Sequence, residues 1–426
     1  MKIITGKFSC LVLMLVSSYH CVAQAPIDTL KLTLPQAENI FLQQNLTLLA
    51  EKYNIGIAAA QIIQAKLYNN PNIEFSGNIY NPEQRKGFDI SNRTGQYTIT
   101  VQQLITVAGK HNKQIKLAET NALLARNRFY DLLRTLRYAL RSNFYQLLYL
   151  QNTLNSYQAQ SSYLEKLNDS YQSLLDKGTV TLKDAVRIKS LLYSSKAEQT
   201  ALQNQINVIN SELQILLKNN NAIVFPLDNA NVSDINVSLS PLGDLYDSAF
   251  VYREDLKLAQ NNIQLSNQNY ALQKAIAVPD VLLGAQFDKR GSFVNNASFL
   301  SVAIDLPFFN RNQGNIKAAK ISIDQSKTLL QIEKTTVENE VQRAYLKMIN
   351  TDKTLHSFDP LFKSQLDKLM LGVTENFQKR NISLLEFTDF FETYRQNILQ
   401  INQLQNDKRQ AMEELQFAVG KTLYTE

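Results

Sequence analysis

The chain has 426 residues, a formal net charge of +6, two cysteines and three histidines. Both cysteines, Cys10 and Cys21, fall in the N-terminal segment described below, so the rest of the chain offers no disulfide, zinc-thiolate site or cysteine nucleophile. The charge is too small to indicate an acidic partner, and no basic patch with interleaved aromatic residues argues for nucleic-acid binding. Motifs of zinc proteases, serine hydrolases, P-loops and dinucleotide-binding proteins are also missing, so we expect no enzyme, no metal site and no cofactor.

The N-terminus has the layout of a secretory signal peptide. Two lysines precede an apolar run at residues 8–16, and small and polar residues follow it. This run is too short to span a bilayer, which takes about 20 residues. We expect cleavage after Ala23; lipidation of Cys21 is the alternative, although the two residues before Cys21 are bulky. Since no later apolar run could form a transmembrane helix, the exported chain would be either soluble or a β-barrel.

The remainder of the chain contains an internal duplication. Residues 103–218 align with residues 305–420 at an offset of 202, and further upstream the offset drifts to 208. One unit of the duplication is therefore about 200 residues long, much longer than the repeat of a solenoid protein. The predicted division is a signal peptide at 1–23, a first repeat at 24–218, a linker at 219–241 and a second repeat at 242–426. Alternating valine, isoleucine and leucine in the linker are compatible with a short strand.

Each repeat is predicted to begin with a helix and to continue with a β-hairpin. The helices cover residues 35–68 and 242–277, and a proline marks the break after each. Apolar residues then take every second position in two segments per repeat, which is the period of a strand with one apolar and one polar face. Polar loops at residues 81–95 and 288–296 separate the two strands of each pair. The four predicted strands are residues 73–75, 97–102, 281–287 and 300–306.

A long helix and a shorter return helix follow each hairpin. Residues 110–177 contain no glycine or proline, and leucine and tyrosine recur there at spacings of three, four and seven, as in a coiled-coil seam. A single helix of this length would span about 100 Å. The corresponding helix of the second repeat is predicted to break at Pro360, which cannot continue a helix without a kink. The return helices are predicted to begin after turns near Thr181 and Ser383.

Four strands cannot close a barrel, because bacterial outer-membrane barrels start at about eight strands. Exposed hairpins with an apolar face would also be an aggregation hazard. A trimer with twelve strands resolves both problems. The predicted fold is therefore mainly α with a small β part, in duplicated halves that each have a β-hairpin and long coiled-coil helices; a trimer would form a 12-stranded β-barrel continued by a periplasmic α-helical barrel. Polar strand residues would face the lumen, among them Glu74, Ser76, Thr98, Thr100 and Gln102.

With these features the chain resembles the TolC-like outer-membrane efflux family over nearly its whole mature length. Residues 306–316, Leu-Pro-Phe-Phe-Asn-Arg-Asn-Gln-Gly-Asn-Ile, resemble the strand-to-helix signature of the cobalt–zinc–cadmium resistance (CzcC-like) branch, and residues 70–72, 103–105 and 108–110 look like its first-half equivalents. The resemblance implies a passive exit duct in the outer membrane of a Gram-negative bacterium, extending into the periplasm. Its implied partners are a periplasmic adaptor (membrane fusion protein), an inner-membrane RND transporter and outer-membrane lipid, and heavy-metal cations are one candidate substrate class.

The resemblance also implies roles for the turns between the long and the return helices. These turns would form the periplasmic tip that meets the adaptor, and Glu386 and Asp389 occupy positions that line the pore constriction in better-known members. Three residues apart on one helix face, they would form stacked acidic rings in a trimer and favour cations. The alternative is that Glu386 only caps its helix and Asp389 is a solvated surface residue. The candidate tip residues are Lys177, Gly178, Thr179, Val180, Thr181, Lys379, Arg380, Asn381, Ile382 and Ser383.

One tip residue departs from the family pattern, and two other functions remain open. Ile382 stands where some members have a basic residue that ties the closed tip, so gating by that salt bridge is not expected here. The alternatives to a metal-efflux duct are a soluble periplasmic coiled-coil scaffold or adaptor, which the alternating strands argue against, and a drug-efflux or type I secretion channel. Because no ladder of soft metal ligands is present, metal selectivity would have to reside in the transporter.

Overall fold

A computed structural model describes residues 28–219, 222–227, 240–291, 294–359 and 361–424. The predicted signal peptide, much of the predicted linker and Pro360 lie outside the described residues. The chain divides into two compact units, and each combines segments from both halves of the sequence. Unit 1 contains Met1–Asn45, Arg137–Asn236 and Thr351–Glu413, and unit 2 contains Leu46–Leu136, Val237–Asn350 and Glu414–Glu426.

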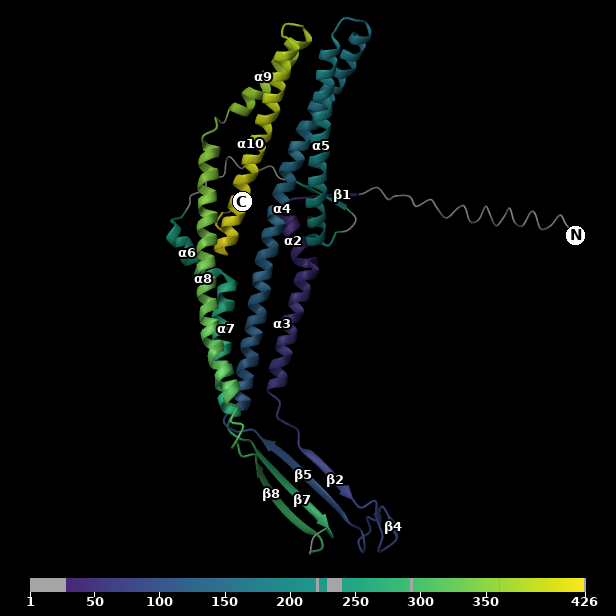
Figure 1. Ribbon diagram of the computed structural model, residues 1–426, viewed down its shortest axis with the longest axis vertical. Helices are drawn as coiled ribbons and strands as arrows, with labels where there is room; N and C mark the ends of the chain where they lie inside the picture. The colour runs from purple at the N-terminus through teal and green to yellow at the C-terminus, as the bar shows by residue number, and fades with distance from the viewer. Residues whose placement is uncertain (1–27, 220–221, 228–239, 292–293, 360, 425–426) are drawn as a thin grey trace, which may run out of the picture. The chain divides into compact units, whose positions relative to one another are not determined.

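Unit 2 contains an antiparallel sheet of four strands in the order β2-β5-β7-β8 (Figure 1). Strand β2 (Asn72–Gly77) pairs with β5 (Tyr97–Ile105), and β7 (Val281–Lys289) pairs with β8 (Ala297–Ile304). These two pairs confirm the predicted hairpins. Pairing of β5 with β7 joins the hairpins of the two halves into one sheet and leaves β2 and β8 as its edges.

The register of this sheet collects apolar side chains on one face. Directly opposed residues of an antiparallel pair point to the same face, so Ile73, Val101, Ala285 and Leu300 form one row across all four strands. The polar residues predicted to face the lumen share the other face, where the apolar exceptions are Leu104, Leu282, Ala297, Phe299 and Ala303. The apolar face comprises Ile73, Phe75, Tyr97, Ile99, Val101, Ile105, Val281, Leu283, Ala285, Phe287, Leu300, Val302 and Ile304, and its non-apolar members are Gly77, Gln103, Lys289 and Ser298.

Two further pairs of short strands lie outside the strands of the predicted hairpins, and of their four members only a short strand in the linker was expected. In unit 2, β3 (Tyr80–Asn81) and β4 (Lys86–Gly87) pair within the expected polar loop of the first hairpin. In unit 1, β1 (Asp28–Leu32) pairs in parallel with β6 (Ala222–Pro226), a strand inside the predicted linker. Strands of two residues are too short for periodicity to reveal them, and the pairing of β1 with β6 joins segments nearly 200 residues apart.

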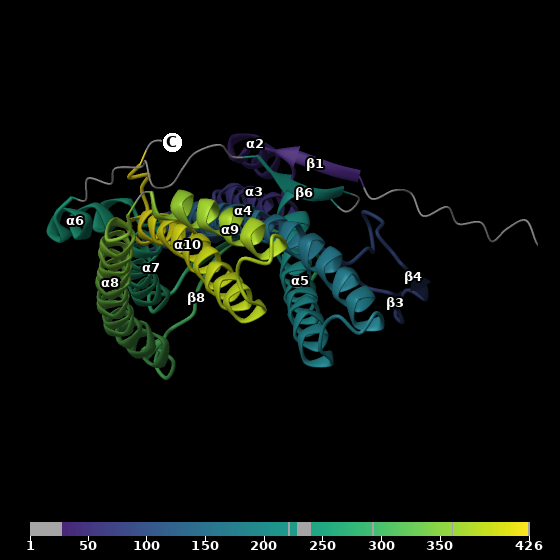
Figure 2. The same ribbon diagram turned by 90° about the horizontal axis from the view of Figure 1, so that it is seen from above.

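The helices follow the predicted order, with one long helix in the first half. Helix α4 (Lys110–Asp176) is continuous over 67 residues, which confirms the predicted long helix. The second half has α8 (Gln313–His356) and α9 (Phe362–Gln378) in its place, so the predicted break is also present. Figure 2 shows α7 beside α8 in unit 2, where the hydroxyls of Ser266 and Ser326 lie 2.8 Å apart. The return helices are α5 (Leu182–Leu217) and α10 (Leu384–Val419).

No helix within the described ranges combines the length and the apolar character needed to cross a bilayer.

The first helix of each half is interrupted, which corrects the prediction of one continuous helix. The first half has α2 (Leu34–Gln44) and α3 (Leu46–Ala65), and the second has α6 (Leu242–Tyr252) and α7 (Glu254–Ile276). The residues between the helices, Asn45 and Arg253, are equivalent at the upstream offset of 208. Both have extended backbones and buried side chains.

The same contact fixes both interruptions. Asn45 Nδ2 donates to Leu216 O at 2.8 Å in unit 1, and Arg253 Nη1 donates to Ala418 O at 3.2 Å in unit 2. The two acceptors are themselves equivalent at the downstream offset of 202. Each side chain satisfies a carbonyl in the last turn of a return helix, where the helix offers no partner of its own. Neither residue is glycine or proline, so the sequence carried no local signal for the break.

Candidate functional site

The first turn, between α4 and α5 in unit 1, ends its helix with a Schellman motif. Gly178 has a φ of 71°, its N–H donates to Leu175 O at 2.8 Å, and Thr179 N donates to Leu174 O at 2.9 Å. These two bonds satisfy carbonyls that the end of the helix leaves open. Only glycine adopts this left-handed conformation without a steric cost, which explains Gly178 at the turn.

The second turn, between α9 and α10 in unit 1, repeats this motif without glycine. Arg380, the equivalent of Gly178, has a φ of 62°. Its N–H donates to Phe377 O at 3.0 Å, and Asn381 N donates to Asn376 O at 2.8 Å. A side chain in the left-handed region costs about 1–2 kcal/mol. The second turn therefore keeps an arginine at its tip against the local conformational preference.

Substitutions of Gly178 and Arg380 are expected to change the free energy of unfolding in opposite directions. Gly178→Ala should destabilise unit 1 by about 1 kcal/mol, because alanine is strained at a positive φ. Arg380→Gly should stabilise it by up to about 1 kcal/mol, since the strain is relieved while the glycine adds entropy to the unfolded chain. Urea unfolding followed by circular dichroism measures both changes. Changes of the same sign would contradict the equivalence of the two turns.

Both return helices begin with a side-chain cap. Thr181 Oγ1 accepts from Asp184 N at 3.2 Å and donates to Asp184 Oδ2 at 2.7 Å. At the second turn Ser383 Oγ accepts from Glu386 N at 3.2 Å, and Ser383 N donates to Glu386 Oε2 at 2.7 Å, which completes a reciprocal capping box. The Ser383 N–H and hydroxyl, which both donate to this carboxylate, lower the pKa of Glu386 below its usual value.

The two acidic pore candidates therefore differ in their surroundings. Glu386 is exposed but engaged in the cap of α10, as the capping alternative predicted. Asp389 is exposed one turn further along the same helix. The cap uses one oxygen of Glu386 and leaves the carboxylate charged, so capping and a pore role are compatible.

The candidate tip residues lie on the two turns of unit 1. Eight of the ten are exposed, whereas the equivalent residues Val180 and Ile382 are half-buried. Ile382 packs against an apolar cluster just below the second turn. This packing contact accounts for an apolar side chain at Ile382, where some members of the resembled family have a basic residue. The cluster is made of Leu164, Leu192, Val373, Phe377, Phe387 and Phe391.

Aromatic rings dominate this cluster and connect the two turns. Phe377 and Phe387 stack at 4.4 Å between ring centroids, and Tyr171 of α4 stacks on Phe377 at 6.2 Å. Tyr163 of α4 lies 5.9 Å from Phe387. Burial raises the pKa of Tyr163 and Tyr171 above the usual value. Tyr171 belongs to the predicted seam of the long helix, whereas Tyr163, Phe377 and Phe387 were not predicted. Phe387 and Phe391, four apart on one helix, were the available signal.

A polar contact further along the helices joins α4, α5 and α10. Arg395 is bonded to Glu198 and to Glu392, and Tyr157 Oη donates to Glu198 Oε2 at 2.6 Å. Burial, followed by the hydrogen bond to Glu198, raises the pKa of Tyr157. Three helices therefore share one charged centre within unit 1, which fixes their register beside the aromatic cluster.

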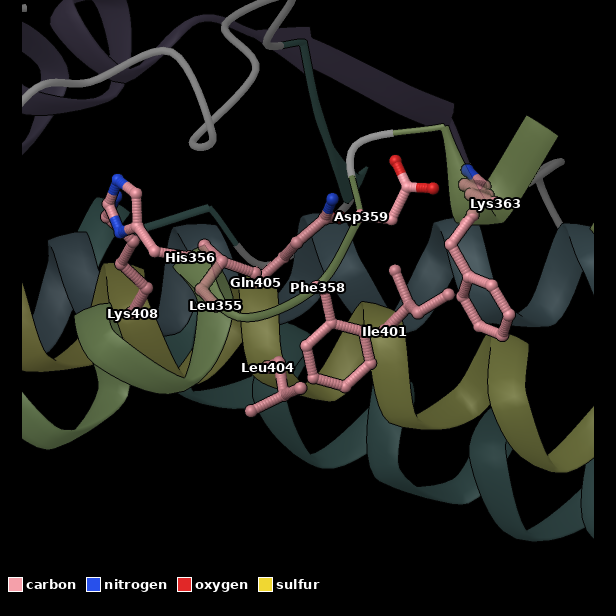
Figure 3. Close-up of a pocket in the computed structure, with 10 residues that line it drawn as sticks. Leu355, His356, Phe358, Asp359, Lys363, Ile401, Leu404, Gln405 and Lys408 are labelled. Carbon is pink, nitrogen blue, oxygen red and sulfur yellow. The ribbon is translucent and has the colours of Figure 1, made fainter. Parts of the chain in front are cut away.

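A cavity of about 250 Å³ lies where α8 and α9 are separated, against α10. Figure 3 shows Phe358 and Ile401 facing each other across its apolar floor, with His356 and Lys408 at one end. Lys408 is fully buried and forms a salt bridge with Asp352 at 3.0 Å. In the first half the continuous helix α4 has no such break.

Across the ranges that the structure describes, no three histidine, cysteine, aspartate or glutamate side chains gather into a possible metal site.

A protein-family model described as "Outer membrane efflux protein" matches the chain twice, over residues 39–217 and 245–421. The first match runs from α2 to α5 and the second from α6 to α10, so the model covers well over half of the chain. No curated protein sequence matches the chain.

Solved structures share the fold at low sequence identity. A membrane protein from Pseudomonas aeruginosa superposes with a TM-score of 0.73 at 15% identity, over 91% of this chain and 92% of that one. The outer-membrane channel OprN gives 0.72 at 14% identity, with coverage of 91% and 89%. The MtrE outer membrane channel of Neisseria gonorrhoeae gives 0.70 at 14% identity, with coverage of 94% of both chains.

Proposed function

Since the chain belongs to the outer membrane efflux protein family, we propose that it forms the outer-membrane exit duct of a tripartite efflux system. Structures of the same fold are named outer-membrane channels, including OprN and MtrE. In this proposal the protein is a passive conduit that extends into the periplasm. An inner-membrane RND transporter and a periplasmic adaptor would supply the energy and the link between the two membranes.

The main support for an outer-membrane channel is the four-stranded sheet. Its mainly apolar face extends across both hairpins, with polar Gln103, Lys289 and Ser298 only near the ends of their strands, as suits a surface in contact with lipid. Its polar face would line a water-filled lumen. Strands β2 and β8 have no partner across their outer edges in the described sheet. Unpaired edges are unsatisfied in a bilayer, so pairing of β8 with β2 of the next copy would close a barrel of twelve strands.

The helices offer a second surface for a trimer. Leu46, Leu49, Tyr53 and Ile57 recur at spacings of three and four along α3, and each is 42–63% exposed. An apolar stripe of this kind normally marks a contact with another protein surface. Ile321, Leu329 and Ile332 are exposed on α8. We assign both surfaces to packing between neighbouring copies.

The oligomeric state and the conductance test this proposal together. Native mass spectrometry of the detergent-solubilised protein is expected to give a trimer, and the same sample should conduct ions across a planar bilayer. A stable monomer without conductance would overturn the exit-duct proposal. Release from membranes as a soluble species would instead favour the scaffold alternative.

The acidic pair is proposed to set the charge selectivity of the pore. Glu386→Gln should lower the preference of the channel for cations, and adding Asp389→Asn should lower it further, because the variants remove carboxylates from the proposed rings. Glutamine still completes a capping box, so Glu386→Gln keeps the helix start. Reversal potentials across a salt gradient in a planar bilayer measure the change.

A matched variant separates the pore charge from the helix cap. Ser383→Ala removes the hydroxyl that accepts from Glu386 N but leaves the carboxylate in place. We expect its cation preference to equal that of the wild type. If Ser383→Ala lowers the preference as much as Glu386→Gln does, the effect comes from the helix start and the pore role is wrong.

The two turns are proposed to dock the adaptor, since their exposed residues project from a rigid aromatic base. For the substrate, the resemblance of residues 306–316 to the CzcC-like signature favours heavy-metal efflux over drug efflux or type I secretion. Deletion of the gene should then lower tolerance to cobalt, zinc, cadmium or copper. Unchanged metal tolerance with lower drug tolerance would move the protein to another branch.

A further inference from the structure

A short apolar segment projects from unit 2 between β8 and α8. Phe309 is 96% exposed, the largest exposed fraction of any large hydrophobic residue in the part of the chain that the structure describes. Leu306 and Phe308 are 65% and 68% exposed. Side chains so exposed need an apolar partner, which is either another protein surface or lipid.

The backbone of this segment is held in place while the side chains face outward. Gln313 Nε2 donates to Phe309 O at 3.3 Å. The side-chain amide of Asn312 donates to Gln273 O of α7 at 2.8 Å, which ties the segment to the neighbouring helix. The exposure of the aromatic rings is therefore built into the junction between sheet and helix.

The segment directly follows the apolar face of β8. Leu300, Val302 and Ile304 lie on that face, and β8 ends at Ile304. The chain then turns, with Phe308 N donating to Leu306 O at 2.9 Å. At about 3.4 Å per residue and a tilt of about 40°, the run from Leu300 to Ile304 rises only about 10 Å. The apolar band of an outer-membrane barrel is about 25 Å tall, so it has room for the segment that follows β8.

We propose that Leu306, Phe308 and Phe309 anchor the chain in the periplasm-facing phospholipid leaflet of the outer membrane. Aromatic side chains gather at this interface in membrane barrels. Arg311, exposed two residues further on, suits the phosphate layer. The duplicated position, residues 106–107, has no aromatic pair, so only the second half carries the anchor. The inference rests on the proposed membrane insertion of the sheet.

The absence of tryptophan from the chain gives a direct test. Phe309→Trp places a single fluorophore in the segment, with Phe308→Trp as the second variant if the first does not assemble. Val302→Trp on the apolar face of the sheet is the deep control, and Leu182→Trp, 66% exposed at the start of α5, is the aqueous control. The full-length protein is reconstituted into vesicles of phosphatidylcholine and phosphatidylglycerol.

We expect lipids brominated near the headgroup to quench Phe309→Trp at least twice as strongly as lipids brominated near the chain ends. Val302→Trp should show the reverse order, and Leu182→Trp should respond only to aqueous iodide. Two results would overturn the anchor: quenching of Phe309→Trp by iodide alone, which would place it in water, and no quenching by either iodide or lipid, which would mean that another copy covers it. If brominated lipid still quenches Val302→Trp in either case, the proposed membrane insertion of the sheet stands. If brominated lipid quenches neither Phe309→Trp nor Val302→Trp, the insertion is overturned as well.

Discussion

Phe387→Ala is expected to destabilise unit 1 by about 3–5 kcal/mol, the usual cost of removing a fully buried phenylalanine. The ring of Phe387 is 0% exposed, stacks on Phe377 and contacts Tyr163 and Phe391. Its loss leaves a cavity and removes contacts between segments on either side of the two turns. Urea unfolding in detergent, followed by circular dichroism, measures the change. Proteolysis at the turns should accelerate in parallel, because the base of the turns is loosened.

Phe390→Ala is the matched control on the same helix. Phe390 is 41% exposed and is not part of the buried cluster. Its truncation should change the free energy of unfolding by no more than about 0.5–1 kcal/mol. A loss below about 1 kcal/mol for Phe387→Ala would show that the cluster relaxes around the cavity and does not hold the turns together.

Arg253→Met is expected to destabilise unit 2 by about 3–5 kcal/mol, because it strips the countercharge from partly buried carboxylates. The Arg253 side chain is 3% exposed, and it binds Asp255, Glu340 and Ala418 O. Arg134 also contacts Asp255, at 3.0 Å, and donates to the end of α10, so it compensates only part of the loss. Thermal unfolding measures the effect.

The stabilisation of unit 2 by the charged centre of Arg253, Asp255 and Glu340 should also depend on pH. Burial alone would raise the pKa of Asp255, but the hydrogen bonds and charge of Arg253 hold it below its usual value of 3.8. The contribution of the Asp255 carboxylate to the free energy of unfolding is therefore complete above pH 3.8. It is lost as the pH falls through the lowered pKa of the folded state. In Arg253→Met this acid-dependent loss should shrink.

Lys327→Met provides the control in the same unit. Lys327 and Asp324 form an ion pair at 3.5 Å, but their side chains are 62% and 74% exposed. Exposed pairs of this kind contribute little, because water screens them. We expect no measurable change in the melting temperature or in its acid dependence. An equal loss in both variants would mean that the Arg253 centre is not specifically required.

The elements with strong periodicity were predictable from sequence. Residues 110–177 lack any helix breaker, and the structure has one helix over nearly the same range. The strands carried the two-residue period, because one face of the sheet is apolar over most of its length. Polar Glu74, Thr98 and Thr100 accordingly share one face, as the alternation required.

The two turns between the long and the return helices were predictable in part. Ser383 and Glu386 have the spacing of a capping box, and the structure contains that box. The spacing did not reveal Arg380 in a left-handed conformation, because glycine is the residue expected at such a position. The aromatic cluster was missed for a related reason: its residues come from four helices and meet only in the fold.

Sequence alone was enough to place the long helix with its end, the return helices and the four strands of the hairpins, and to show which strand residues share a face. Each of these depends on neighbours within a few positions along the chain. Tertiary structure alone decided the interruptions at Asn45 and Arg253, since each exists to place a side chain on a carbonyl more than 160 residues away. It also decided the union of the two hairpins in one sheet, because backbone pairing between distant strands leaves no local trace.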